Sequence, residues 1–259
     1  ADRFNDALSA GRGQQLPPTE IGPEDLAFLQ YTGGTTGVSK GAMLTHRNMV
    51  ANMLQVRNWF GPHVQDGSEI IITALPLYHI FALTCNCLVF MNVGGLNVLI
   101  TDPRDMPGFV KELSRYRFTI ITGVNTLFNG LLNTPGFADL DFSSLKLSMG
   151  GGMAVQRAVA EKWQKVTRCA LFEGYGMTES SPVATVNRPD TREYTGSIGV
   201  PAPGTELSIQ DDDGRLLAQG EVGEICIRGP QVMKGYWQRP EESAKTITPE
   251  GWLRTGDVG

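Results

Sequence analysis

The chain has 259 residues, of which 41% are hydrophobic and 19% are charged, and this balance is typical of a globular protein. A net charge of −5 and the lack of a basic tract argue against nucleic acid as a partner. The four cysteines have neither the spacing of a zinc site nor that of a disulfide framework, so we expect reduced thiols in a cytoplasmic protein.

The N-terminal part predicts a connecting segment followed by two strands. Residues 1–25 are rich in glycine, proline and polar residues and predict a linker or surface connection. The run LAFLQYT (26–32) predicts a strand that ends at a glycine-rich loop, and KGAMLTH (40–46) resumes as an extended segment. Thr45 then stands where a helix N-cap belongs, because apolar residues follow it at helical spacing.

The stretch from residue 70 to residue 101 contains no Asp, Glu, Lys or Arg and is long enough to span a bilayer. Proline, histidine, asparagine and glycine residues interrupt it where turns are expected. We therefore favour a buried strand (70–75), a buried helix (80–93) and a second strand (96–101) over a transmembrane helix.

Helices and strands are expected to alternate from residue 106 to residue 176, which predicts an α/β core with a largely parallel sheet. Near residue 196 the pattern changes to short alternating strands with many glycines, which is typical of antiparallel structure. We therefore divide the chain into an α/β core (26–192) and a smaller β-rich subdomain, a distorted barrel (193–259). Within the core, the predicted helices are 106–116, 126–132 and 154–167, and the predicted strands are 118–124, 145–152 and 169–176.

The loop YTGGTTGVSKGA, from Tyr31 to Ala42, has the composition of a polyphosphate site. Successive glycines let backbone N–H groups converge on an anion, threonines add hydroxyl donors, and Lys40 adds a positive charge. The lysine does not have the spacing of a Walker A loop, and no helix begins inside the segment as a dinucleotide fingerprint requires. The alternative is a glycine hairpin that holds no ligand.

Three further segments carry groups that suit a nucleotide. EGYGMTES (173–180) follows a strand and offers the flat ring of Tyr175, the Thr178 hydroxyl and the Glu179 carboxylate, a ligand type suited to Mg²⁺. GGGM (150–153) lets a planar ring approach the backbone. Asp257, in WLRTGD, can accept both vicinal hydroxyls of a ribose. By themselves, EGYGMTES and the turn that contains Asp257 also fit ordinary surface turns.

Taken in order, YTGGTTGVSKGAMLTHRN, LPLYHIFAL, EGYGMTES, GEICIRGPQVMKGYW and WLRTGDVG resemble the adenylate-forming superfamily, which includes acyl-CoA synthetases, luciferases and peptide-synthetase adenylation domains. Within it, the chain is most similar to bacterial long-chain fatty acyl-CoA synthetases (long-chain-fatty-acid–CoA ligases). Gly33 and Ser39 depart from the serine and proline common at those positions. The resemblance implies an acid–thiol ligase that converts a fatty acid and ATP to acyl-adenylate, and then to acyl-CoA.

The resemblance also implies roles for individual residues. Thr178 would contact the α-phosphate and Glu179 would hold Mg²⁺, and these two are the expected catalytic residues. Gly151, Gly152 and Tyr175 would bind adenine, and Asp257 the ribose. The expected acyl pocket comprises His79, Phe81, Gly123, Val124, Gly150, Gly176 and Met177. The expected phosphate loop comprises Tyr31, Thr32, Gly33, Gly34, Thr35, Thr36, Gly37, Val38, Ser39, Lys40, Gly41 and Ala42.

The implied partners are a fatty acid, ATP and coenzyme A, with peripheral contact at the cytoplasmic face of the inner membrane. A homodimer is left open. The family's C-terminal domain, with its catalytic lysine, would follow the TGD motif, so we expect this fragment to be inactive or very slow. The alternatives are a medium-chain or aryl acid–CoA ligase, a nucleotide-binding module without turnover, and a membrane-associated interaction domain.

Overall fold

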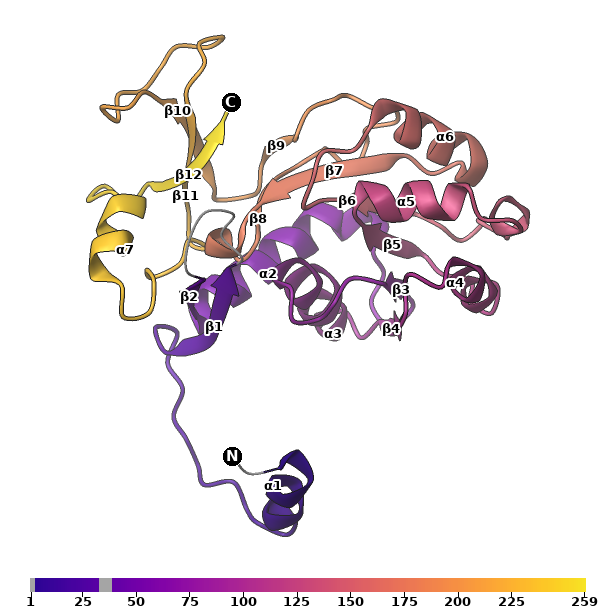
Figure 1. Ribbon diagram of the computed structural model, residues 1–259, viewed down its shortest axis with the longest axis horizontal. Helices are drawn as coiled ribbons and strands as arrows, with labels where there is room; N and C mark the ends of the chain where they lie inside the picture. Colours follow the sequence, from indigo (N-terminus) through magenta and orange to yellow (C-terminus); the bar gives the residue numbers. More distant parts are fainter. Residues whose placement is uncertain (1–2, 33–38) are drawn as a thin grey trace.

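The computed structural model describes residues 3–32 and 39–259 and is built around a seven-stranded sheet (Figure 1). The strand order is β4-β3-β5-β6-β7-β8-β9, and the pairs from β4 to β7 are parallel. The last two pairings, β7 with β8 and β8 with β9, are antiparallel. The predicted α/β fold is therefore confirmed. The strands are β3 (Ile70–Thr73), β4 (Leu96–Leu99), β5 (Ile120–Gly123), β6 (Leu147–Gly150), β7 (Leu171–Gly176), β8 (Val183–Val186) and β9 (Val200–Pro201).

Helices cover both faces of this sheet, which explains why β5 and β6 are buried along their whole length. On one face, Phe109, Phe128 and Trp163 form a core from α4, α5 and α6. On the other face, Phe60 and Val89 pack against the sheet from α2 and α3. These helices are α2 (His46–Phe60), the π-helix η2 (Ala82–Leu88), α3 (Val89–Asn92), α4 (Met106–Leu113), α5 (Asn125–Leu132) and α6 (Arg157–Thr167).

The apolar stretch from residue 70 forms the predicted strand, helix and strand. Its helical part begins as the π-helix η2, a form often found near functional sites. No helix in the described parts of the chain is long and apolar enough to cross a membrane. Thr45 caps α2 as predicted: its side chain accepts from the Asn48 N–H, and the Asn48 side chain accepts in return from the Thr45 N–H.

Two smaller antiparallel sheets flank the large one. The first pairs β1 (Leu26–Thr32) with β2 (Lys40–Thr45), and the second has the order β10-β11-β12. A third core cluster, including Leu44, Ile227 and Leu253, joins the two small sheets. The antiparallel pattern predicted for the C-terminal part is thus present. The strands of the second sheet are β10 (Glu206–Gln210), β11 (Glu224–Arg228) and β12 (Leu253–Val258).

Two helices were not predicted from the sequence. Helix α1 (Phe4–Gly11) lies within the segment 1–25 and has no buried residue, so no buried apolar face marks it. Helix α7 (Pro240–Thr246) has a proline and two glutamates in its first turn, which is a recognisable start signal. Short 3₁₀ helices complete the fold: η1 (Gly61–His63), η3 (Phe137–Asp139) and η4 (Thr178–Ser180).

Candidate active site

A cavity of about 520 Å³ opens where β6 and β7 end. This is the carboxyl edge of the parallel strands, where open α/β sheets bind their ligands. Segments that are distant in sequence contribute to its wall, from β1 to β12. The lining residues are Thr32, His79, Ile80, Phe81, Met149, Gly151, Gly152, Gly174, Tyr175, Gly176, Met177, Thr178, Glu179, Pro182, Val183, Val186, Thr255 and Asp257.

The turn after β7 places Thr178 and Glu179 on the cavity wall. The chain leaves β7 at Gly176, forms η4 and doubles back into β8. A Cβ atom at Gly176 would lie 1.9 Å from the Pro182 carbonyl oxygen, so this tight return requires glycine. Because the turn is so constrained, the Glu179 side chain is held against the cavity while the residue is only 5% exposed.

The structure brings the predicted adenine and ribose groups into direct contact. The Tyr175 hydroxyl donates a hydrogen bond of 2.7 Å to Oδ2 of Asp257, which comes from β12. Burial, together with this bond, raises the pKa of Tyr175, so its hydroxyl stays protonated and neutral. Gly151 and Gly152 lie on the same cavity, and a Cβ atom at Gly151 would come within 3.0 Å of the Phe81 ring. The two groups predicted to enclose a planar base, Tyr175 and the Gly151–Gly152 turn, therefore line one cavity.

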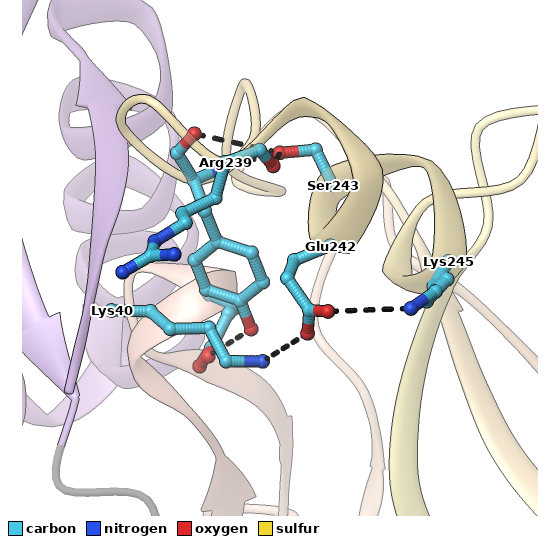
Figure 2. A network of polar contacts seen from close by, with 7 residues as sticks. Lys40, Arg239, Glu242, Ser243 and Lys245 are labelled. Carbon is cyan, nitrogen blue, oxygen red and sulfur yellow. Dashed lines mark hydrogen bonds and ion pairs between the residues drawn. The ribbon is translucent and has the colours of Figure 1, made fainter. Parts of the chain in front are cut away.

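A polar network connects Glu179 with Lys40, the lysine predicted for the phosphate loop. Figure 2 shows the Lys40 end of this network, with Glu242 and Lys245 beside it. The Tyr236 hydroxyl donates to Oε1 of Glu179 at 2.7 Å. Lys40 Nζ lies 4.8 Å from the centroid of the Tyr236 ring and forms an ion pair of 2.9 Å with Oε2 of Glu242. The sequence interpretation missed Tyr236 and Glu242: Tyr236 lies in the motif GEICIRGPQVMKGYW, for which no role was predicted.

The environment of Glu179 suits a magnesium ion that arrives with a nucleotide. One carboxylate oxygen is tied to Tyr236, whereas no described residue donates to the other, and Glu179 lines the cavity. The described residues contain no group of three side chains able to hold a metal by themselves. Magnesium is commonly held by one or two carboxylates together with substrate phosphates, and this arrangement fits that pattern.

Four of the seven residues predicted for the acyl pocket line the cavity: His79, Phe81, Gly176 and Met177. His79 Nδ1 accepts from the Phe81 N–H at 3.2 Å, and partial desolvation lowers the pKa of His79. Sequence reasoning missed Met149, Val183 and Val186, which together with Ile80 form the apolar part of the wall and for which no role was predicted.

Gly123, Val124 and Gly150 do not line the cavity, since their own neighbours fill the space around them. A Cβ atom at Gly123 would lie 2.6 Å from the Leu127 side chain, and one at Gly150 would lie 2.5 Å from that of Val155. Val124 packs against the core on the α4–α6 face. These residues shape the sheet behind the cavity.

Six residues of the predicted phosphate loop, Gly33, Gly34, Thr35, Thr36, Gly37 and Val38, lie outside the described residues. The two ends of the loop are described and lie side by side, because Thr32 of β1 pairs with Lys40 of β2. The Ser39 hydroxyl donates to the Thr32 carbonyl at 2.6 Å, and Thr32 lines the cavity. Tyr31 is exposed, whereas Gly41 and Ala42 are buried in β2.

Comparison with known proteins decides the family. The family model described as AMP-binding enzyme matches residues 2–237. The chain belongs to the AMP-binding enzyme family. The chain is 60% identical, over 255 residues, to a long-chain-fatty-acid–CoA ligase of Escherichia coli O157:H7. The match covers 98% of this chain but 45% of that protein, so the chain spans about half the length of the curated relatives it matches.

Solved structures of related proteins have the same fold. ATP-bound MatB from Rhodopseudomonas palustris is 31% identical, with a TM-score of 0.84, over 98% of this chain and 49% of that one. The anthranilate CoA ligase AuaEII in complex with anthranoyl-AMP is 28% identical, with a TM-score of 0.87, over 99% of this chain and 49% of that one. The mixed sheet and the small antiparallel sheets therefore form about half of a larger known architecture.

Proposed function

We propose that this chain supplies the nucleotide- and carboxylate-binding part of a long-chain fatty acid–CoA ligase. The observation that carries the proposal is a cavity at the ends of β6 and β7, which gathers Tyr175, Thr178, Glu179 and Asp257 from two distant segments. The identity to a long-chain-fatty-acid–CoA ligase over nearly the whole chain supports the same assignment. Because the chain spans about half of such relatives, ATP binding is proposed for the chain as described and thioester formation for the full-length protein.

The proposed chemistry has two steps. A carboxylate oxygen of the fatty acid attacks the α-phosphorus of ATP, the bond to pyrophosphate breaks, and an acyl-adenylate forms. The sulfur of coenzyme A then attacks the acyl carbon, and AMP leaves with the electrons of the broken carbon–oxygen bond. A free carboxylate is a poor acyl donor, whereas the mixed anhydride has a good leaving group. Catalysis of the first step is mainly positioning and charge stabilisation.

In this proposal, the residues around the cavity hold ATP for attack. Tyr175 and the Gly151–Gly152 turn would enclose the adenine, and the Asp257 carboxylate would accept from the ribose hydroxyls. The Thr178 hydroxyl would donate to the α-phosphate, and Lys40 would pair with the outer phosphates. When bound with the nucleotide, Mg²⁺ supplies neutralisation of the phosphate charge, and Glu179 would hold it.

The apolar part of the cavity wall favours a fatty acid. Ile80, Phe81, Met149, Val183 and Val186 line it, and among the lining residues the acidic side chains are Glu179 and Asp257, which already have nucleotide roles. An amino-acid substrate would usually require a further carboxylate for its ammonium group. An aryl acid remains a second candidate because the fold matches an anthranilate CoA ligase closely. We also propose that the protein is cytoplasmic and makes peripheral contact with the membrane.

Hydroxylamine capture of the acyl-adenylate tests this function in a full-length protein, of the same length as the curated relatives. Palmitate, octanoate and benzoate are compared as substrates with ATP and Mg²⁺, and acyl-CoA is measured after coenzyme A is added. We expect adenylate and thioester from palmitate at rates at least about tenfold above benzoate, a discrimination of about 1.4 kcal/mol. Preference for octanoate or benzoate would favour the alternative acid, and nucleotide binding without any adenylate would favour a binding module.

A further inference from the structure

The segment from Met233 to Glu242 is anchored to the candidate site by its backbone. The Met233 N–H donates to the Glu179 carbonyl at 2.8 Å, directly behind the predicted metal ligand. The Met43 N–H donates to the Gly235 carbonyl at 2.8 Å, and Lys234 and Trp237 donate back to β2 at 3.0 and 2.8 Å. These bonds fix the segment relative to both β2 and η4, so the side chain of Tyr236 has a defined position beside the site.

Tyr236 contacts two of the residues proposed to handle phosphate and metal. Its hydroxyl donates to Glu179 Oε1, and Lys40 Nζ lies over its ring. The residue is 6% exposed and does not line the cavity, whereas Glu179 does.

Helix α7 holds Lys40 from its other side. Glu242 accepts from Lys40 at 2.9 Å, and its second carboxylate oxygen lies 3.4 Å from Lys245 Nζ. The hydrogen bonds and charges of Lys40 and Lys245 lower the pKa of Glu242, so the carboxylate is ionised when it pairs with Lys40. The ring of Tyr236 and the charge of Glu242 therefore hold the lysine beside the residue that bonds Glu179.

We propose that Tyr236 is a positioning residue, which orients the Glu179 carboxylate toward the magnesium–nucleotide complex without touching that complex itself. The inference rests on the proposed function of the cavity. With Oε1 held by Tyr236, rotation of the carboxylate is restricted, and Oε2, to which no described residue donates, is left for the metal. Without the Tyr236 hydroxyl, the Glu179 carboxylate loses its hydrogen-bond donor and must reorient before it can bind the metal. Because a hydrogen bond to an ionised group is stronger than one between neutral groups, we expect removal of the hydroxyl to reduce the magnesium-dependent gain in ATP affinity about tenfold.

Tyr236→Phe removes the hydroxyl and keeps the ring that packs against Lys40. ATP binding to the chain is measured by calorimetry, once in EDTA and once in a magnesium titration. We expect the magnesium-dependent gain in ATP affinity to fall about tenfold, while affinity in EDTA changes less than about twofold. Tyr194→Phe is the matched control: it also loses one hydroxyl donor, here a 3.0 Å bond to the Val155 carbonyl, away from the cavity.

A double-substitution cycle with Glu179→Gln distinguishes positioning from a general loss of structure. If Tyr236 acts through Glu179, Tyr236→Phe has little further effect once Glu179 has lost its charge. Three results would overturn the inference: a parent-like magnesium response in Tyr236→Phe, an equal loss of affinity in EDTA, or additive effects in the cycle. A parent chain that binds ATP without any magnesium response would also overturn it, and a parent that binds no ATP at all would overturn the proposed function itself.

Discussion

Replacing Lys40 with alanine tests whether the predicted loop holds phosphate. In the structure Lys40 pairs with Glu242, and the two side chains are 34% and 40% exposed, so this pair resembles a surface ion pair worth at most about 1 kcal/mol. The free energy of unfolding should therefore fall by less than about 1 kcal/mol. A charge-assisted hydrogen bond to a phosphate contributes more, about 2 kcal/mol, which corresponds to roughly a 30-fold rise in the Kd for ATP.

Calorimetry with ATP and with adenosine measures the two parts of this prediction. Adenosine carries no phosphate, so its affinity should be the same in Lys40→Ala and in the parent. Lys245→Ala is the matched control, because this lysine approaches the same Glu242 at 3.4 Å but its side chain is 72% exposed. An ATP affinity that is unchanged in Lys40→Ala, with measurable binding in the parent, would refute the phosphate role.

Further substitutions test the cavity and the sheet. Asp257→Asn removes the carboxylate that accepts from Tyr175, and if Asp257 also binds the ribose, the Kd for AMP should rise about tenfold by calorimetry, with unchanged affinity arguing against that role. Gly176→Ala places a Cβ atom 1.9 Å from the Pro182 carbonyl and should lower the free energy of unfolding by about 3 kcal/mol in urea titrations; a cost below about 1 kcal/mol would contradict the tight return. Burial raises the pKa of Glu173, so the stability that this residue contributes is complete below its ordinary pKa of 4.5 and is lost as pH rises through the higher folded value. Glu173→Gln should therefore flatten the dependence of the unfolding free energy on pH in this range. An unchanged slope would contradict the raised pKa.

Much of the fold could be predicted because its signals are local. A run such as FTIITGV must be a buried strand, and the apolar stretch from residue 70 is interrupted by turn residues at the right places. Helix α1 gave no such signal, since its eight residues bury nothing and no neighbouring element specifies it. Helix α7 was missed for a different reason. Its proline and glutamate start signal is present, but the many glycines in this part of the chain are typical of antiparallel strands, and strands were predicted.

The residues of the candidate site divide in a similar way. Tyr175, Thr178 and Glu179 lie in one short motif at a strand end, so sequence position alone brings them to the carboxyl edge of the sheet. The contact between Tyr175 and Asp257 crosses 82 residues and depends on how β12 meets the large sheet, which no local pattern specifies. Gly123 and Gly150 do not line the cavity and pack against Leu127 and Val155, because a glycine at a strand end can serve packing as well as ligand approach.

Tyr236 combines both difficulties. Its motif stood out in the sequence, but the chemistry of a tyrosine in an apolar β segment is indistinguishable from that of an ordinary core residue until its hydroxyl has a partner. The structure supplies that partner in Glu179, 57 residues earlier, and it places the Lys40 ammonium over the same ring. A buried hydroxyl and a buried carboxylate would each be costly alone, so the pair is stable only when the two segments meet. The predicted metal ligand and the predicted phosphate lysine thus depend on a third segment, which explains why a single short motif cannot define this site.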